Sequence, residues 1–237
     1  MTLKEFLINL RKIIQDRLQV ITFFYKFAKN PTDNRYTYQK DFIHHQFAQE
    51  EKILDIGSGG DPFPYATILA DRYLEPTCHR SAVFKVDGKP VIICDICNLP
   101  FIDGAFDYVV AAHVLEHVDD PIKACLELQR VAKSGFIETP TLMKDALFSW
   151  AKGMHKWHLL SQGNRLFFFE YTDRTSEGIR SSAWFNTIFS TMYHPLQDAF
   201  NENQDIFNVM FEWKKQFDIT VIRQDGSMVS HNSSKSN

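Results

Sequence analysis

The sequence lacks any long uninterrupted apolar run and any excess of basic residues. Hydrophobic residues make up 44% of its 237 positions, yet no apolar stretch approaches the roughly 20 residues that a transmembrane helix needs. Lys and Arg number 26 against 29 Asp and Glu, with a pI near 6.3, so the electrostatic footprint of a nucleic-acid-binding protein is missing. No internal repeat is visible. We therefore expect one globular domain with additions, no membrane span and no nucleic-acid partner.

Cysteine is also scarce, with four residues and no recognisable secretion signal. This composition is typical of reduced thiols in a cytoplasmic protein. Cys94 and Cys97 have the spacing of a metal-binding knuckle, but a second pair of that spacing is lacking. Because Cys94 falls in a predicted strand, small core residues are the favoured interpretation, and no metal is expected.

Apolar runs that end on an acid occur three times in the first half of the chain. Asp55 closes the first and precedes a glycine-rich turn, Asp71 closes the second, and Asp95 closes the third. A buried parallel strand reads as such an apolar run, and open α/β sheets bind ligands beyond the carboxyl ends of their strands. The pattern predicts a small polar ligand with cationic or hydroxylated parts. A fourth run, residues 106–112, leads into His113.

In this order and spacing the chain resembles the class I S-adenosylmethionine-dependent methyltransferases, in particular the methyltransferase type 11 branch. The resemblance covers about residues 50 to 141 and is carried by Leu54–Gly60, Asp71, Asp95, Leu99–Phe101, Phe106–Asp107, Val114–Pro121 and Arg130–Gly135. It implies an α/β, Rossmann-like, mostly parallel seven-stranded sheet with helices on both faces. An N-terminal helical cap and aromatic C-terminal additions would complete the fold.

The resemblance also implies a cofactor, S-adenosyl-L-methionine, and roles for the matching residues. Gly57 and Gly59 would let main-chain groups meet the methionine part, and Asp71 would accept the ribose hydroxyls. Asp95 would accept from the adenine amino group beside the amide of Ile96. Leu99 and Phe101 would cover the adenine faces. The expected cofactor-binding residues are Asp55, Gly57, Ser58, Gly59, Gly60, Asp71, Asp95, Ile96 and His113.

The glycine-rich turn departs from the family pattern at Asp61, where a third glycine is common. Pro62 and Pro64 follow at once, and two prolines this close cannot both sit inside a helix. The segment before Thr67 is also near the minimum length for a helical crossover. We therefore expect a shortened or absent first helix. The departure leaves open the contacts of Ser58, Gly60 and Asp61.

Three regions are expected along the chain: a helical cap (1–49), the methyltransferase domain with substrate-side elements (50–225), and a disordered tail (226–237). Apolar residues recur at helical spacing over 3–27, with basic residues in excess over acidic ones. Packing on this domain or a partner chain is favoured for that helix, and peripheral membrane contact stays an alternative. A second helix is expected over 36–49.

Further elements are predicted from turns and periodicity. Asp87-Gly88 suggests a small hairpin between 82–86 and 91–94, and Gln162-Gly163-Asn164 suggests another between 155–160 and 166–170. Residues 183–192 and 196–215 are typical of helices. Residues 217–222 are expected to form the antiparallel strand that closes the sheet.

Several histidines are candidates for chemistry. His113, Glu116 and His117 match the H-x-x-E-H pattern of inverted zinc peptidases, but Pro121 and the preceding strand-like run argue against the helix that this pattern needs. His113 is expected beside the cofactor or substrate, while Glu116 and His117 brace the loop. His113 and His155 are the candidate catalytic residues, and His158 is a further candidate base.

The sequence thus predicts an enzyme that moves a methyl group from S-adenosylmethionine to a small-molecule, lipid-linked or glycan acceptor. A protein that binds S-adenosylmethionine or S-adenosylhomocysteine without chemistry is the first alternative, and the zinc peptidase is the second. The acceptor atom and the oligomeric state are left open.

Overall fold

The computed structural model describes residues 35–76, 83–148, 154–172 and 202–233. The amphipathic segment 3–27 and the helix expected over 183–192 lie outside these ranges. Statements below concern the described residues.

The centre of the fold is a mostly parallel sheet of six strands, in the order β3-β2-β1-β4-β5-β8. Only β8 runs antiparallel, against β5. The strands are β1 (Ile53–Ile56), β2 (Ile68–Asp71), β3 (Val91–Ile93), β4 (Tyr108–Ala112), β5 (Ser134–Pro140) and β8 (Asn208–Lys214). The Rossmann-like α/β prediction is confirmed, but the expected seventh strand is not part of this sheet within the described ranges.

Alternate residues of the strands bury two different faces of this sheet, since side chains in a strand point to opposite sides. Leu54, Val109 and Ile137 belong to one apolar cluster, which also contains buried residues of a second sheet. Ile53 and Tyr108 belong to the cluster on the other face, which the segment 36–66 covers. The central strands β1, β4 and β5 are thus buried on both sides, which explains their continuous apolar runs.

The connections β4 to β5 and β5 to β6 contain three helices: η1 (Leu115–His117), α3 (Pro121–Val131) and α4 (Leu142–Phe148). Asp120 caps α3, where its Oδ1 accepts from the amide of Lys123 at 3.0 Å, and Pro121 fills the first turn. The expected shortening of the first crossover is confirmed, because residues 57–67 contain no helix.

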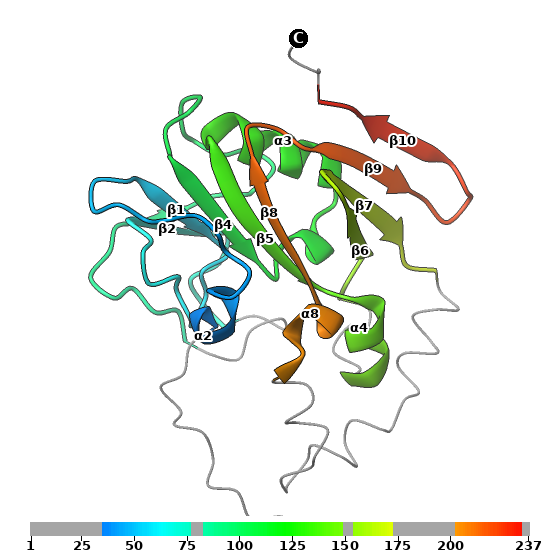
Figure 1. Ribbon diagram of the computed structural model, residues 1–237, viewed down its shortest axis with the longest axis horizontal. Coiled ribbons are helices and arrows are strands. Elements are labelled where there is room, and N and C mark those ends of the chain that lie inside the picture. The colour runs from blue at the N-terminus through cyan, green and yellow to red at the C-terminus, as the bar shows by residue number, and fades with distance from the viewer. Residues whose placement is uncertain (1–34, 77–82, 149–153, 173–201, 234–237) are drawn as a thin grey trace, which may run out of the picture.

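A second, four-stranded sheet has the order β10-β9-β7-β6 and lies to the right of the first in Figure 1. It contains β6 (Trp157–Gln162), β7 (Arg165–Glu170), β9 (Asp218–Ile222) and β10 (Met228–His231). The predicted hairpin around Gly163 is confirmed as β6 and β7. Buried side chains of β6, β7 and β9, such as Leu159, Phe168 and Ile219, pack in the same cluster as Trp213 of the first sheet.

Three predictions about the C-terminal part were wrong. The strand at residues 218–222 does not close the first sheet but pairs in parallel with β7. Its expected place is taken by β8, where a helix was predicted within 196–215. In β8 the buried side chains Val209, Phe211 and Trp213 alternate with less buried ones, and this period of two is that of a strand. Residues 228–231 of the expected disordered tail form β10 against β9.

The helix expected over 36–49 is reduced to α2 (Tyr36–Gln39). The chain then leaves helical geometry, because the amides of His44 and His45 donate to Glu212 on β8 at 2.9 and 3.0 Å. Asp87 and Gly88 form the predicted turn with positive φ angles, but residues 83–86 form no strand, so the small hairpin is absent there. The other short helix, α8 (Gln204–Phe207), precedes β8.

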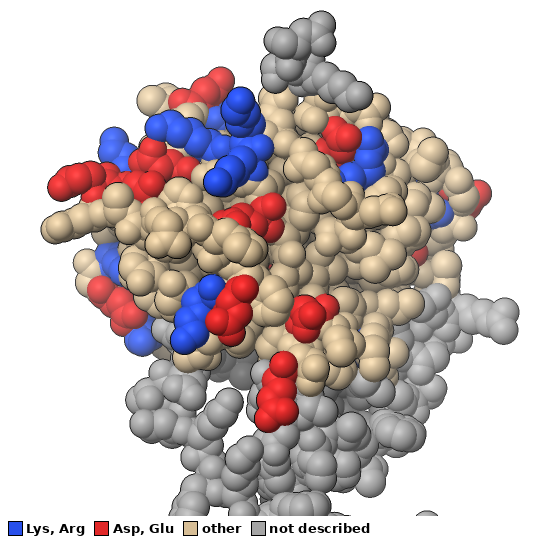
Figure 2. Space-filling view, in the orientation of Figure 1, with Lys and Arg blue, Asp and Glu red and all other residues tan. Residues whose placement is uncertain are grey.

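The surface mixes charges of both signs. On the face shown in Figure 2, Lys and Arg stand beside Asp and Glu, most densely at the upper left. In the part of the chain that the structure describes, no helix is long and apolar enough to span a bilayer.

Candidate functional site

A cleft of about 1370 Å³ lies along the carboxyl ends of the parallel strands. Residues from the loops after β1, β2, β3 and β4 line it, as does the segment before β6. Of the expected cofactor residues it collects Gly57, Ser58, Gly59, Gly60, Asp71, Asp95, Ile96 and His113. The fold thus brings these residues together along one cleft. Their contacts with a cofactor remain predictions.

The turn after β1 needs glycine at its first position. Gly57 has a φ of +69°, which non-glycine residues rarely adopt, and its amide donates to Ala70 on β2 at 2.7 Å. A Cβ there would lie 2.2 Å from Cγ2 of Val114. Gly57 thus lets the turn after β1 pack directly on the loop after β4. The amide of Gly59, two residues on, donates to Oδ2 of Asp71 at 3.3 Å.

Asp71 and Asp95 stand at neighbouring strand ends with their carboxylates oriented by main-chain groups. Oδ1 of Asp71 accepts from the amide of Tyr73 at 3.0 Å, and Oδ1 of Asp95 accepts from the amide of Cys97 at 2.8 Å. Oδ2 of Asp95 lies 3.2 Å from Arg72. Two oriented carboxylates on one wall of the cleft suit the hydroxyl and amino donors of a nucleoside.

Three residues do not lie where the resemblance placed them. Asp55 does not line the cleft, because its side chain points to the face of the sheet that the segment 36–66 covers. There its Oδ2 accepts from the amide of Phe63 at 2.7 Å. Burial raises the pKa of Asp55 to about 6. Leu99 is 4% exposed and packs in the core with Phe101 against it, and neither lines the cleft.

Asp61, the departure from the family pattern, has a local partner. Its Oδ2 accepts from the amide of Arg35 at 2.9 Å and from Nε at 3.3 Å, while Nη1 of Arg35 reaches the carbonyl of Ala112 at 3.3 Å. Arg35 thereby joins the glycine-rich turn to the end of β4. Both Arg35 and Asp61 line the cleft.

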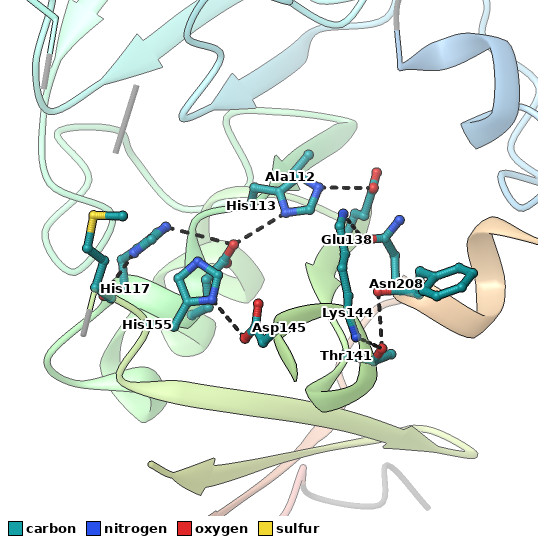
Figure 3. Close-up of polar contacts among 12 residues, drawn as sticks. Ala112, His113, His117, Glu138, Thr141, Lys144, Asp145, His155 and Asn208 are labelled. Carbon is teal, nitrogen blue, oxygen red and sulfur yellow. Dashed lines mark hydrogen bonds and ion pairs between the residues drawn. The ribbon is translucent and has the colours of Figure 1, made fainter. Parts of the chain in front are cut away.

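His113 follows β4 and lies between two buried carboxylates (Figure 3). Its φ of 59° is unusual for a residue with a side chain. Nδ1 lies 3.4 Å from Oε1 of Glu116, and Nε2 lies 3.2 Å from Oε1 of Glu138. His113 therefore has one buried carboxylate beside each ring nitrogen.

Glu138 ends this network on the other side. It is fully buried at the end of β5 and accepts from Tyr38 Oη at 2.8 Å and Gln39 Nε2 at 2.6 Å. Burial alone would raise the pKa of Glu138, but His113, Gln39 and Tyr38 outweigh it and lower the pKa to about 2. The carboxylate therefore stays ionised at neutral pH.

Glu116, His117 and His155 form a second cluster in the same cleft. Burial would raise the pKa of Glu116, which is 1% exposed, but His113, His117 and His155 lower it to about 2. The rings of His117 and His155 meet edge to face with their centroids 4.7 Å apart. Nδ1 of His117 lies 3.2 Å from the Met154 carbonyl.

His155 is held by a buried acid on α4, as Figure 3 shows. Its Nδ1 lies 2.8 Å from Oδ2 of Asp145, and Oδ2 also accepts from Tyr171 Oη at 2.7 Å. Burial lowers the pKa of His155, but its hydrogen bond to the Asp145 carboxylate and the charge of Glu116 give a net rise. His158 instead stacks on Phe169 at 5.0 Å and does not line the cleft.

Lys144 is a site residue that sequence analysis missed, together with Arg35, Tyr38, Glu138 and Asp145. It is 3% exposed and its Nζ lies 2.5 Å from Oδ1 of Asn208. Burial lowers its pKa to about 8. Of these residues, only Glu138 is recognisable in the sequence, as a charged residue inside an apolar strand. The others come from elements whose position relative to the sheet no local pattern reveals.

Comparisons with known proteins agree with this geometry. Residues 54–137 match the model of the methyltransferase type 11 family, described as a methyltransferase domain. An uncharacterised protein of Methanocaldococcus jannaschii is 30% identical over 125 residues, which cover 50% of this chain and 51% of that protein. The chain thus spans about half the length of the curated relative it matches.

Solved structures of S-adenosylmethionine-dependent methyltransferases are similar over part of the chain. One from Thermotoga maritima is 24% identical, with 41% of this chain and 47% of that chain covered and a TM-score of 0.31. One from Aquifex aeolicus is 19% identical, with 44% and 62% covered and a TM-score of 0.32. Residues 54–137, which carry the strand-end motif and most of the lining of the cleft, thus match a methyltransferase domain of the type 11 family.

Proposed function

We propose that this protein transfers the methyl group of S-adenosylmethionine to a small-molecule, lipid-linked or glycan acceptor. The observation that carries the proposal is the division of the cleft. Asp71 and Asp95 stand at the ends of β2 and β3, on one side of β1, whereas His113 after β4 and Pro140 at the end of β5 line the cleft on the other side. A cofactor bound across this switch in strand order would direct its sulfonium toward the second half.

The cleft is large enough for two ligands. Pockets for single drug-sized ligands occupy about 300–1,000 Å³, and this cleft measures about 1370 Å³. It therefore has room for an acceptor beside the cofactor. When bound, S-adenosylmethionine supplies an activated methyl group, so the chain's main task is to hold the acceptor at near-attack distance and to exclude water.

The acceptor half is polar. Lys144, His155 and Lys156 line it together with His117 and Asp119. The aromatic side chains Trp157 and Phe168 are at most 2% exposed and belong to the core. The polar lining residues Lys144, His155 and Lys156 favour an acceptor with hydroxyl or anionic groups at the methylated end.

The first test is titration of the purified protein with S-adenosylmethionine and S-adenosylhomocysteine by calorimetry. Asp71→Asn and Asp95→Asn each remove one charged acceptor, and hydrogen bonds to charged groups contribute about 1.5–3 kcal/mol. We therefore expect each variant to bind roughly 10- to 100-fold more weakly.

Asp103→Asn is the matched control, because the Asp103 side chain is 83% exposed and pairs only on the surface with Arg130 among the described residues. The affinity of this variant for S-adenosylmethionine should equal that of the unchanged protein. Absence of binding, or equal loss in all three variants, would contradict the proposed cofactor site. Binding without methyl transfer to any hydroxylated acceptor in a metabolite extract would instead favour a non-catalytic S-adenosylmethionine-binding protein.

A further inference from the structure

Three side chains in the acceptor half of the cleft have the composition of a metal site. Glu116, His117 and His155 each present a ligand atom, and these atoms all lie within 4.8 Å of one another. They come from two separate parts of the chain, η1 and the segment before β6, and the fold brings them together. Their convergence is therefore a property of the tertiary structure and not of the H-x-x-E-H sequence alone.

Glu116 is the first independent sign of a ligand. It is 1% exposed, and neither carboxylate oxygen has a hydrogen bond within the described ranges. Its contacts with His113 and His117 are ion-pair distances of 3.4 and 3.8 Å. A buried carboxylate without hydrogen bonds is costly. A cation between Glu116 and the two imidazoles would remove that cost.

His155 is the second sign, because a buried carboxylate already orients its ring. Asp145 holds Nδ1 at 2.8 Å and is itself held by Tyr171. With Nδ1 engaged, Nε2 is the nitrogen that can take a ligand. Histidines that bind metals usually donate their other nitrogen to a carboxylate or carbonyl in this way. The Met154 carbonyl oxygen orients His117 in the same way, since it lies 3.2 Å from Nδ1 of His117.

Buried acids surround the cluster. Glu116, Glu138 and Asp145 are each at most 1% exposed. The buried Lys144 lies in the same part of the cleft, and its Nζ contacts Oδ1 of Asn208. A cation bound at Glu116, His117 and His155 would be attracted by these carboxylates.

We propose that Glu116, His117 and His155 bind a divalent transition-metal cation that holds an oxygen of the methyl acceptor in the cleft. Two imidazoles suit zinc better than magnesium or calcium, which prefer oxygen ligands. A tetrahedral ion with bonds of about 2.1 Å holds its ligand atoms about 3.4 Å apart, so side-chain movements of roughly 1 Å would close the site.

The arrangement differs from that of an inverted zinc peptidase. There both histidines of the motif bind the metal and the glutamate acts on water. Here His113 turns toward Glu138, and His155, outside the motif, takes its place beside His117. The remaining coordination positions would face the cleft. The role in acceptor binding rests on the proposed function, whereas ion binding does not.

The test measures ion binding and cofactor binding on the same samples. The full chain is stripped with a chelator and titrated with zinc, manganese and cobalt by calorimetry, and bound metal is counted by mass spectrometry after dialysis. We expect one ion per chain. His155→Ala should weaken ion binding at least about 100-fold, and Asp145→Asn, which loosens the His155 ring, about 10- to 100-fold.

His158→Ala is the control, since His158 lies three residues further along the chain, in β6, but stacks on Phe169 and does not line the cleft. It should leave ion affinity unchanged, and all variants should bind S-adenosylmethionine within about threefold of the unchanged protein. His155→Gln keeps a polar side chain of similar size and serves if His155→Ala does not fold.

Absence of stoichiometric binding, or equal loss of it in His155→Ala and His158→Ala, would overturn the metal site. Ion binding without S-adenosylmethionine binding would overturn the proposed function and leave the ion site standing. With both established, an acceptor whose binding does not depend on the ion would overturn the acceptor role.

Discussion

At the scale of single residues, Asp55 of β1 and Asp71 of β2 have opposite surroundings. Asp71 is oriented by main-chain amides on the wall of the cleft. Asp55, which the family resemblance placed with it, is 2% exposed on the far face of β1. It accepts a hydrogen bond from Phe63 and so anchors the loop that replaces the first helix. Its contribution is therefore structural.

Asp55→Asn should stabilise the protein at neutral pH. Burial raises the folded-state pKa to about 6 from 3.8, so the folded state binds this proton more tightly than the unfolded state does. The contribution of Asp55 to the free energy of unfolding therefore declines as pH rises from about 4 to about 6. The decline is at most about 3 kcal/mol, at 1.36 kcal/mol per pKa unit.

Urea unfolding at pH 4 and pH 7.5 checks this prediction. The variant should match the unchanged protein near pH 4 and exceed it at pH 7.5. The Asn oxygen can still accept from Phe63. A variant that is less stable at both values would show that the ionised carboxylate stabilises the fold.

At the scale of elements, Glu138 connects three pieces of chain. It lies on β5, accepts from Tyr38 and Gln39 in α2, and faces His113 after β4. A helix of four residues has almost no stability alone. The position of α2 against the sheet therefore depends on this buried carboxylate.

Glu138→Gln should loosen α2 and change the acid sensitivity of the protein. The folded-state pKa is lowered to about 2 from 4.5, so its stabilisation is complete above about pH 4.5 and is lost as pH falls toward 2. Breaking a buried ion pair costs about 3–5 kcal/mol. The variant should be less stable at pH 7 and show a smaller further loss below pH 4.5.

Hydrogen exchange of residues 36–43 measures the loosening of α2 directly. Urea unfolding at pH 7, 4 and 3 measures how the free energy of unfolding changes with pH. Glu50→Gln, at an exposed position, is the control. Unchanged protection of residues 36–43 would show that α2 is held by packing alone.

At the scale of the whole molecule, the two sheets share one apolar core. Phe168 of β7 is fully buried in the cluster that also contains Trp213 of β8 and Leu128 of α3. The four-stranded sheet therefore is an extension of the central fold and positions the segment that carries His155. It should not unfold on its own.

Phe168→Ala should lower the free energy of unfolding by about 3–5 kcal/mol, because it leaves a cavity in this shared core. Peptides from β1 to β5 and from β6 to β9 should lose hydrogen-exchange protection at the same urea concentration in the unchanged protein and in the variant. Earlier loss in β6 to β9 would mean that the second sheet is a separate unit.

Sequence patterns predicted the parts of this fold whose signal is local. The apolar runs of β1, β2 and β4 and the turns at Gly57 and Gly163 are encoded in neighbouring residues. The pairing of β8 with β5 and of β9 with β7 depends on long-range packing, and helical composition in 196–215 obscured the alternation in β8. The Glu116, His117 and His155 cluster required the tertiary fold, since neither segment alone has a complete ligand set.

The antiparallel pairing of β5 with β8 has a consequence during synthesis. A ribosome produces β5 well before residues 208–214 exist. Until then β5 is an edge strand, and its apolar residues Phe136 and Ile137 accompany a row of unpaired amide and carbonyl groups. The nascent chain therefore passes through a stage that is prone to aggregation, and it ends only when residues 208–214 emerge and pair with β5.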